Sequence, residues 1–271
     1  MKSGKRNREQ IHLGTHGEDY GSWMSNPVFY MVGGLLTLSV VLAALSFALF
    51  HLPWLGIVCG ILAAAFLALL CWCGWIRKQY AFGGGGMMER THLCILSHLD
   101  FDGRGTLLDV GCGSGALSIR AALTWPDTQV IGIDYWGAAY GYDRAMCEKN
   151  AASEGVAARC TFRQGDANKL DFPNGSFDAV VSNYVYHNIV GADKQALLRE
   201  TLRVLKPGGV FALNDDMKPR MYGDMEAFAR ELQAAGFQEV HLVDTATEVF
   251  GSPQRAAKML LGHSRMLGGR K

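Results

Sequence analysis

The chain has 271 residues, with 26 lysines and arginines against 25 aspartates and glutamates, and 49% of its residues are hydrophobic. A near-balanced charge provides no broad positive surface, so we expect no nucleic-acid partner. The apolar content suffices for a folded core, which excludes general disorder, and the length allows one medium-sized domain plus a smaller element.

The first predicted element is an apolar hairpin. Residues 28–76 contain no Asp, Glu, Lys or Arg, and His51-Leu52-Pro53 divides them into two spans, residues 28–50 and 54–76. At 1.5 Å per residue, each span can cross roughly 30 Å of hydrocarbon. We therefore predict a transmembrane helical hairpin, with a buried hairpin in a soluble core and a cleaved signal peptide as the alternatives.

Basic residues flank the hairpin on one side only. The turn between the spans carries no fixed charge, whereas bases lie in the segment 1–27 and directly after the second span: Lys2, Lys5, Arg6, Arg8, Arg77 and Lys78. Because cytoplasmic flanks of membrane spans are enriched in Lys and Arg, we predict a multi-pass cell-membrane protein whose termini and remaining domain are cytoplasmic.

The cysteines indicate a reducing compartment. Three of the seven lie in the spans and four are scattered over later elements, without a C-x-x-C pair. We identify no histidine, among eight, at a metal-ligand spacing to a cysteine. We therefore expect neither a metal nor a disulfide framework.

Residues 77–99 are predicted to form a junction and a first helix, Met87–Leu99. Four consecutive glycines, Gly83–Gly86, lie between Tyr80 and Phe82 on one side and two methionines on the other. A flexible linker is usually longer and richer in serine. We interpret the glycines as a hinge at the edge of a site, and a simple linker is the alternative.

From residue 100 to residue 271, short apolar runs alternate with helical periods. This alternation predicts an α/β domain with a parallel sheet and helices on both faces. The predicted strands are Thr106–Val110, Gln129–Ile133, Arg159–Arg163, Ala179–Ser182, Val210–Leu213 and Glu239–Val243, and the predicted helices are Ala116–Leu123, Tyr142–Glu154, Lys194–Leu205 and Met225–Ala235.

Glycines and a carboxylate follow the first two strands of this domain, at the sheet edge where ligands bind. The first strand leads into D-V-G-C-G-S-G-A, in which Gly111, Gly113 and Gly115 leave a turn without Cβ atoms before a helix. The second strand leads to Asp134, whose carboxylate is suited to a ribose diol. Both features fit a nicotinamide cofactor as well as S-adenosylmethionine.

Three later motifs separate these two cofactors: G-D-A at residues 165–167, F-D-A-V-V-S at 177–182 and L-K-P-G-G at 205–209. With the glycine loop and Asp134, this series resembles the class I S-adenosylmethionine-dependent methyltransferases, especially the small-molecule and quinone-type branch, over residues 107–213. An NAD(P) oxidoreductase is disfavoured because no tyrosine has a lysine four positions later. The N-P-P-Y signature of base and amide methyltransferases is absent.

The resemblance implies a Rossmann-like, seven-stranded sheet whose last strand, near Ser264–Gly268, is antiparallel. It also implies S-adenosyl-L-methionine as the cofactor. By position in the motifs, the cofactor-binding residues would be Asp109, Gly111, Cys112, Gly113 and Gly115 for the methionine part, Asp134 for the ribose, Tyr135, Asp166 and Ala167 for the adenine, and Ser182 and Asn183 on the sulfonium side.

Methyl transfer needs alignment, exclusion of water and, for a protonated acceptor, a base. His187 is the candidate base, with Tyr186 beside it; Asp215 and Asp216 either orient a substrate or lie in a solvated turn. The predicted function is transfer of a methyl group to a small, membrane-partitioning acceptor: a lipid, quinone precursor, thiol or phenol. Candidate acceptor-binding residues are Tyr20, Trp23, Tyr80, Phe82 and Tyr184. A non-catalytic S-adenosylmethionine-binding membrane protein is the alternative.

Overall fold

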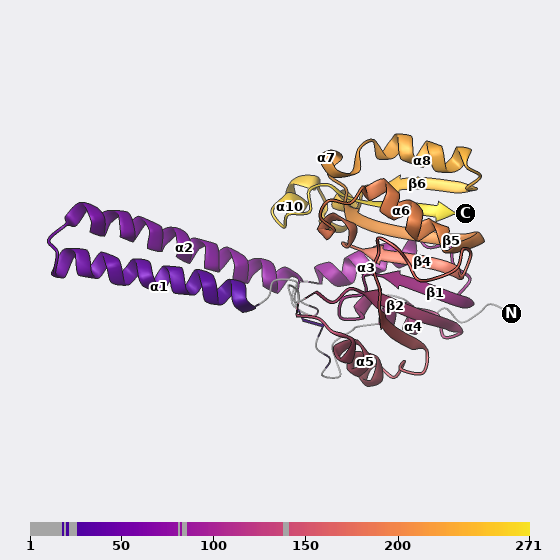
Figure 1. Cartoon of the computed structure of the whole chain (residues 1–271), viewed down its shortest axis with the longest axis horizontal. Helices are drawn as coiled ribbons and strands as arrows, with labels where there is room; N and C mark the ends of the chain where they lie inside the picture. The colour runs from indigo at the N-terminus through magenta and orange to yellow at the C-terminus, as the bar shows by residue number, and fades with distance from the viewer. Residues whose placement is uncertain (1–17, 19, 22–25, 81, 83–85, 138–140) are drawn as a thin grey trace.

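A computed structural model describes residues 18, 20–21, 26–80, 82, 86–137 and 141–271. Its first part is a hairpin of two antiparallel helices, α1 (Asn26–Ala48) and α2 (Pro53–Tyr80), which projects from one edge of an α/β domain (Figure 1). Proline stands at the start of α2, where its missing N–H leaves no hydrogen bond unmade. The helix continues four residues past the predicted end of the second span, through Arg77 and Lys78.

The base of the hairpin is fixed to itself and to the domain. The Arg77 guanidinium donates a hydrogen bond of 2.7 Å to the Asn26 side chain and lies 5.2 Å from the ring centre of Phe29, which ties α2 to α1. Ile76 is fully buried, and the Tyr80 hydroxyl donates a 2.8 Å hydrogen bond to the carbonyl of Met259. The last turn of α2 therefore belongs to the core of the domain.

A seven-stranded sheet forms the centre of the domain, in the order β3-β2-β1-β4-β5-β7-β6. The first five strands in the chain pair in parallel, and β7 runs antiparallel between β5 and β6. This arrangement confirms the predicted fold class. The strands are β1 (Gly105–Val110), β2 (Thr128–Asp134), β3 (Cys160–Gln164), β4 (Phe177–Asn183), β5 (Leu205–Asp216), β6 (Glu239–Val243) and β7 (Ser264–Arg270).

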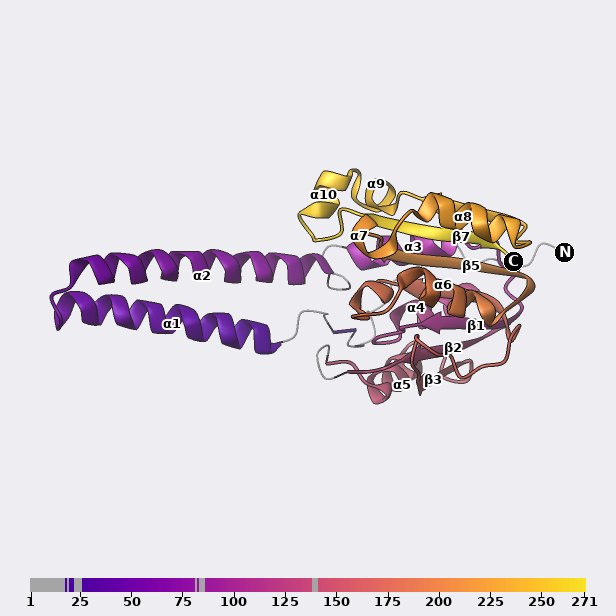
Figure 2. The same cartoon turned by 45° about the horizontal axis from the view of Figure 1, so that its top comes forward.

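Helices cover both faces of the sheet because successive strand residues point to opposite sides. In β1, Leu107 packs into one apolar cluster and Leu108 into the other. One face carries α3 (Met87–Ser97), α4 (Ala116–Thr124), α5 (Arg144–Ser153), α9 (Thr245–Phe250) and α10 (Pro253–Ala257); the other carries η2 (Tyr186–Asn188), α6 (Lys194–Arg203), α7 (Pro219–Tyr222) and α8 (Met225–Ala234) (Figures 1 and 2).

The observed β5 is much longer than the predicted strand at Val210–Leu213. It begins at Leu205 and includes the Pro207-Gly208-Gly209 segment, which precedes the predicted strand. The register of β5 against β4 shifts between Phe177 and Ala179. Gly208 has φ +78°, so the glycine absorbs an irregularity inside the strand rather than ending it.

Candidate active site

The carboxyl ends of the parallel strands lie at the sheet edge from which the hairpin projects (Figures 1 and 2). Asp109 lies near the end of β1, and β2 and β4 end at Asp134 and Asn183. Asp215 and Asp216 end β5. The predicted site residues of separate strands thus share the edge where parallel α/β sheets bind ligands.

The glycine loop connects β1 to α4 through left-handed backbone. Gly111, Gly113 and Gly115 have φ of +75°, +55° and +84°. A Cβ atom on Gly111 would stand 2.1 Å from a methyl carbon of Val185, so this position combines unusual backbone with close packing. Cys112 is buried, and burial followed by the neighbouring Cys147 raises the pKa of its thiol. Cys112 therefore offers its backbone to the loop, not its side chain.

Asp109 is buried behind the loop, with 1% of its surface exposed. The Ser118 hydroxyl donates a 2.6 Å hydrogen bond to its carboxylate. Burial raises the pKa of Asp109 to about 7; the nearby charge of Asp134 acts in the same direction, and the Ser118 hydrogen bond opposes the shift. A cationic ligand at this edge would favour the ionised form.

Asp134 accepts hydrogen bonds from two backbone N–H groups, of Gly113 at 2.9 Å and of Trp136 at 2.8 Å. Trp136 has φ +47°, and its indole N–H donates a 2.9 Å hydrogen bond to the Gly113 carbonyl. The segment directly after Asp134 therefore folds back over the glycine loop, with Trp136 as a wall. The Tyr135 side chain is instead 67% exposed.

The remaining residues predicted for the cofactor lie after β3 and at the end of β4. Asp166 is exposed and closes a turn by accepting hydrogen bonds from the backbone and side chain of Asn168, and Ala167 packs on the sheet. Ser182 is fully buried and donates to the Val110 carbonyl at 2.8 Å. The Asn183 amide oxygen accepts from the Asn214 side chain at 2.9 Å. The side chains of Ser182 and Asn183 are thus held by neighbouring strands.

His187 and Asp215 form a hydrogen-bonded dyad after β4 and at the end of β5. The Nδ1 atom of His187 is hydrogen-bonded to the Asp215 carboxylate, which is fully buried, while the histidine side chain is 26% exposed. Asp215 also accepts from the backbone N–H groups of Tyr186, His187 and Asp216. With Nδ1 bound to a carboxylate, Nε2 of His187 is the nitrogen that remains for a substrate proton.

Two sequence-based interpretations near the dyad are corrected. Tyr186 is fully buried, and its hydroxyl hydrogen-bonds to Thr201 on α6 at 2.9 Å, so it does not reach a reacting group at the sheet edge. Asp215 and Asp216 are also buried, at the end of β5, and not in a solvated turn. The predicted strand ends at Leu213, whereas β5 continues for three more residues.

Aromatic side chains from distant segments surround this edge. Tyr184, with φ +56°, hydrogen-bonds to Ser264 and lies in an edge contact with His187 at 6.4 Å between ring centres. Tyr80, from the end of α2, is a neighbour of Tyr184 and Asp216.

The segment before α1 packs on the domain as well. Tyr20 is buried, its hydroxyl donates a 3.2 Å hydrogen bond to Glu154, and its ring centre lies 4.8 Å from that of Phe82. The predicted residue Trp23 and three of the four junction glycines, Gly83–Gly85, lie outside the described residues; Gly86 precedes α3 with φ +66°.

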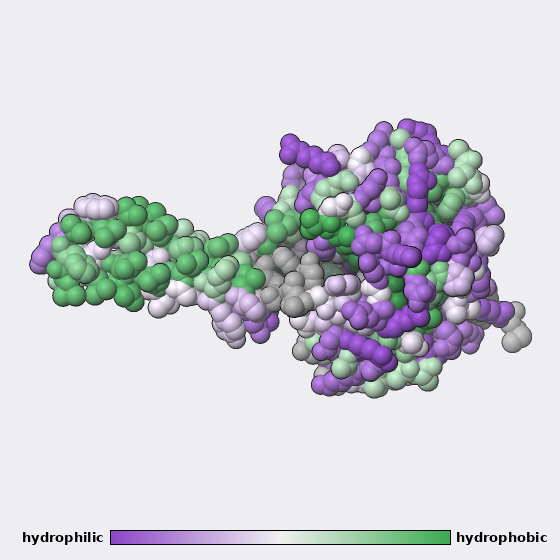
Figure 3. All heavy atoms as spheres, viewed as in Figure 1, coloured by the Kyte–Doolittle hydropathy of each residue, from purple (hydrophilic) through white to green (hydrophobic). Residues whose placement is uncertain are grey.

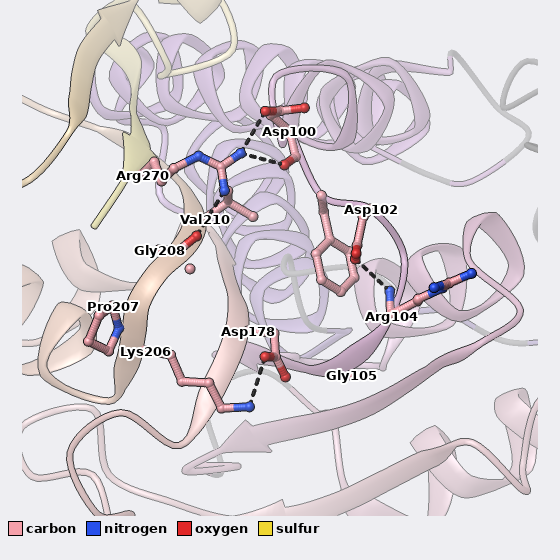
Figure 4. Close-up of a pocket in the computed structure, with 12 residues that line it drawn as sticks. Asp100, Asp102, Arg104, Gly105, Asp178, Lys206, Pro207, Gly208, Val210 and Arg270 are labelled. Atoms are coloured by element: carbon pink, nitrogen blue, oxygen red, sulfur yellow. Dashed lines mark hydrogen bonds and ion pairs between the residues drawn. The ribbon is translucent and has the colours of Figure 1, made fainter. Parts of the chain in front are cut away.

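A cavity of about 710 Å³ lies at the opposite edge of the sheet (Figure 4). Ion pairs between Arg270 and Asp100 at 2.6 Å and between Lys206 and Asp178 at 2.8 Å cross its walls. It adjoins Gly105 at the start of β1, whereas ligands of such sheets bind beyond the carboxyl ends. We assign it no part in the chemistry.

Comparison with known proteins agrees with this geometry. Residues 108–213 match a family described as "Methyltransferase domain". A sterol 24-C-methyltransferase of Aspergillus fumigatus is 36% identical over 40% of this chain and 26% of its own length. A demethylmenaquinone methyltransferase of Symbiobacterium thermophilum is 32% identical over 49% of this chain and 51% of its own length. The chain thus spans about half or less of these relatives.

Solved structures show the same fold. Geranyl diphosphate C-methyltransferase from Streptomyces coelicolor, in complex with Mg²⁺, geranyl-S-thiolodiphosphate and S-adenosyl-L-homocysteine, superimposes with a TM-score of 0.53 at 16% identity, covering 67% of this chain and 75% of that chain. A [4+2]-cyclase, SpnF, superimposes with a TM-score of 0.52 at 23% identity, covering 72% and 84%. The family match, the relatives and the strand order together lead to one conclusion: the chain contains a class I methyltransferase domain, and S-adenosyl-L-methionine is its cofactor.

Proposed function

We propose that this protein is a membrane-anchored methyltransferase that transfers a methyl group from S-adenosylmethionine to a small, hydrophobic acceptor. One observation carries the proposal: the last turn of the apolar hairpin supplies Tyr80 to the same sheet edge as Tyr184 and His187. An acceptor dissolved in the bilayer would meet the site where the hairpin enters the domain.

The hairpin is proposed to span the membrane. Its two helices are long and apolar, and only 11% and 17% of the residues in their most apolar stretches are buried. The visible hairpin surface is largely hydrophobic, whereas the surface of the α/β domain is largely hydrophilic (Figure 3). Exposed apolar surface on this scale is costly in water, and hydrocarbon would cover it. We place the domain on the cytoplasmic side, as the flanking bases predict.

The cofactor is proposed to lie across the glycine loop. The Gly111–Gly115 backbone and Asp109 would hold the methionine part, Asp134 the ribose, and Asp166 with Ala167 the adenine. Trp136 would form a wall of this pocket in addition to Tyr135, because its indole already closes over Gly113. Ser182 and Asn183 would contribute through their backbone, since their side chains are held by Val110 and Asn214.

Proton transfer is assigned to His187, with Asp215 as its positioning residue. A carboxylate on Nδ1 fixes the ring and stabilises the imidazolium that forms when Nε2 takes a proton from the acceptor. The sulfonium of S-adenosylmethionine supplies the activated methyl group, so alignment and exclusion of water remain the main tasks of the protein. Tyr80 and Tyr184 would bound the acceptor from the membrane side, and Tyr20 and Phe82 would cover the junction.

A lipid headgroup, a quinone precursor, a thiol and a phenol are all acceptors of the proposed class. The test uses the full chain in lipid vesicles with S-adenosylmethionine carrying a labelled methyl group, followed by mass spectrometry of extracted lipids and added acceptors. We expect a labelled product one methylene heavier, formed by the wild type and by Asp100→Ala at the opposite sheet edge, and lost in Asp134→Ala.

Two outcomes would contradict the proposal. Cofactor binding without turnover on the membrane extract and acceptor panel would favour a non-catalytic S-adenosylmethionine-binding protein. Equal turnover of water-soluble and membrane-dissolved acceptors would contradict the proposal that the acceptor partitions into the membrane. The similarity in fold to a chain described as a [4+2]-cyclase makes the first measurement necessary, because the fold alone does not fix the reaction.

A further inference from the structure

α3 and α9 lie on the same face of the sheet (Figure 2). Three side chains of types that can bind a metal ion lie close together there. Cys94 and His98 belong to the end of α3, and Glu248 belongs to α9. One ligand atom from each, the thiol sulfur, an imidazole nitrogen and a carboxylate oxygen, lies within 4.8 Å of the other two. The cluster lies apart from the glycine loop and the His187–Asp215 dyad, and the proposed methyl transfer does not use it.

The expectation that no histidine stands at a metal-ligand spacing to a cysteine is wrong for His98. Cys94 and His98 are four residues apart, which places them on one side of a helix. The third ligand comes from α9, which was not among the predicted helices.

The histidine is held in the orientation that a metal ligand requires. Its Nδ1 atom lies 3.1 Å from the carbonyl oxygen of Cys94. A carbonyl oxygen only accepts hydrogen bonds, so Nδ1 carries a proton and Nε2 is directed elsewhere. A backbone carbonyl on one imidazole nitrogen commonly fixes the tautomer and ring position of a histidine that binds a metal through the other.

The Nε2 atom of His98 faces an Oε atom of Glu248 at 3.6 Å. Both atoms carry lone pairs, so a positive charge between them, either a proton or a cation, would make this approach favourable. In a tetrahedral zinc site, bond lengths of about 2.0–2.2 Å separate a nitrogen and an oxygen ligand by roughly 3.3–3.4 Å. The two side chains therefore stand close to the spacing that an ion would set.

The thiol completes the donor set. Cys94 is buried, with 8% of its surface exposed, and its sulfur lies within 4.8 Å of ligand atoms of His98 and Glu248. Binding would release the thiol proton to solvent as the metal–sulfur bond forms.

We propose that Cys94, His98 and Glu248 bind a divalent ion of the zinc type, with water as a fourth ligand. One sulfur, one nitrogen and one oxygen suit zinc rather than calcium or magnesium, which prefer oxygen alone. The ion would join α3, the helix that follows the hairpin and junction, to α9 near the C-terminus. It would therefore stabilise the attachment of the hairpin to the domain.

The test is titration of the full chain in detergent, first stripped with a chelator, with Zn²⁺ alone by calorimetry and with Co²⁺ by absorption spectroscopy. We expect one equivalent of Zn²⁺ to bind and to raise the melting temperature, and Co²⁺ to produce a thiolate-to-cobalt charge-transfer band. Cys94→Ser should lose the band. Glu248→Gln, a change at a partly exposed position that should fold normally, should weaken Zn²⁺ binding at least tenfold.

Matched controls distinguish this site from adventitious binding. His51→Ala, in the exposed hairpin turn, and Cys71→Ser, on an exposed face of α2, remove one histidine or cysteine elsewhere and should retain the cobalt band and the zinc stoichiometry. Absence of a charge-transfer band in the wild type, its persistence in Cys94→Ser, or equal Zn²⁺ affinity of wild type and Glu248→Gln would each overturn the proposal. All of these readouts are independent of methyl transfer.

Discussion

Folding changes the protonation of Asp109. Its pKa is raised to about 7 by burial, against about 3.9 for an unfolded aspartate. Between these two values the folded chain holds a proton that the unfolded chain has released. The contribution of Asp109 to stability therefore falls as pH rises from about 4 to about 7, and the free energy of unfolding should carry that slope.

We predict that Asp109→Asn removes this slope. The variant cannot ionise, so its stability relative to wild type should rise between pH 5 and pH 8, as measured by urea unfolding of the full chain without cofactor. Asp178→Asn is the control, because hydrogen bonds from Lys206 and Thr106 outweigh burial and lower the pKa of Asp178. Ionised Asp178 stabilises the folded chain above about pH 4, and this contribution is lost only below that pH. The free energy of unfolding of Asp178→Asn should therefore be lower than that of wild type by the same amount at pH 5 and pH 8. Parallel curves for Asp109→Asn and wild type would contradict the prediction.

A second prediction at the scale of single residues concerns the His187–Asp215 dyad. If His187 accepts the proton of the acceptor, both His187→Gln and Asp215→Asn should lower kcat by about 10²- to 10⁴-fold with little change in KM for the cofactor. Since the two residues act as a unit, the double variant should be little worse than either single one. His241→Gln, on the distant β6, should have the same kcat as wild type. An unchanged kcat in Asp215→Asn would contradict the positioning role of Asp215, and an unchanged kcat in His187→Gln would contradict the role of His187 as the base.

At the scale of elements, the sequence predicted the strands best where apolar residues alternate with glycine turns. Asp143, whose side chain accepts from the Met146 N–H at 2.7 Å, begins α5 two residues later than the helical period suggested. The short helices α7, α9 and α10 were missed because four to six residues do not establish a helical period. Their contribution to the site, through Met259 beside α10 for example, required tertiary packing that no local pattern encodes.

The glycine loop is the element whose geometry gives the sharpest prediction. Gly111→Ala combines φ +75° with a Cβ atom 2.1 Å from Val185, whereas Gly155→Ala combines φ +71° with open space. We expect Gly155→Ala to cost about 1–2 kcal/mol of stability, the usual cost of a left-handed side chain, and Gly111→Ala to cost more and to weaken cofactor binding. Thermal unfolding and calorimetric titration with S-adenosylhomocysteine measure both effects.

Val185→Ala separates the two contributions at Gly111. Removing the Val185 methyl groups should recover part of the stability lost in Gly111→Ala but leave the part caused by φ. Full recovery would show that the backbone is not strained there, and no recovery would show that Val185 moves aside without cost. Either result would revise the description of Gly111 as left-handed backbone packed closely against the Val185 side chain.

At the scale of the whole molecule, the hairpin and the domain are one mechanical unit. Tyr80 and Ile76 are buried against the domain, while Arg77 joins the two helices at their base. The carboxyl edge of the sheet is consequently held facing the hairpin. The sequence indicated Tyr80 as a candidate acceptor-binding residue, but its hydrogen bond to Met259 could not be predicted, because the two residues lie far apart in the chain.

The proposed membrane orientation can be tested by cysteine labelling in cells. In a background lacking native cysteines, His51→Cys in the turn should react with a membrane-impermeant maleimide added outside, because this turn would cross to the far side. Arg255→Cys, at an exposed position on α10, should react only after the membrane is opened. The reverse pattern would place the domain outside, and labelling of both positions in intact cells would show that the hairpin does not span. Because the flanking bases favour the cytoplasm and the turn lacks charge, we expect the first pattern.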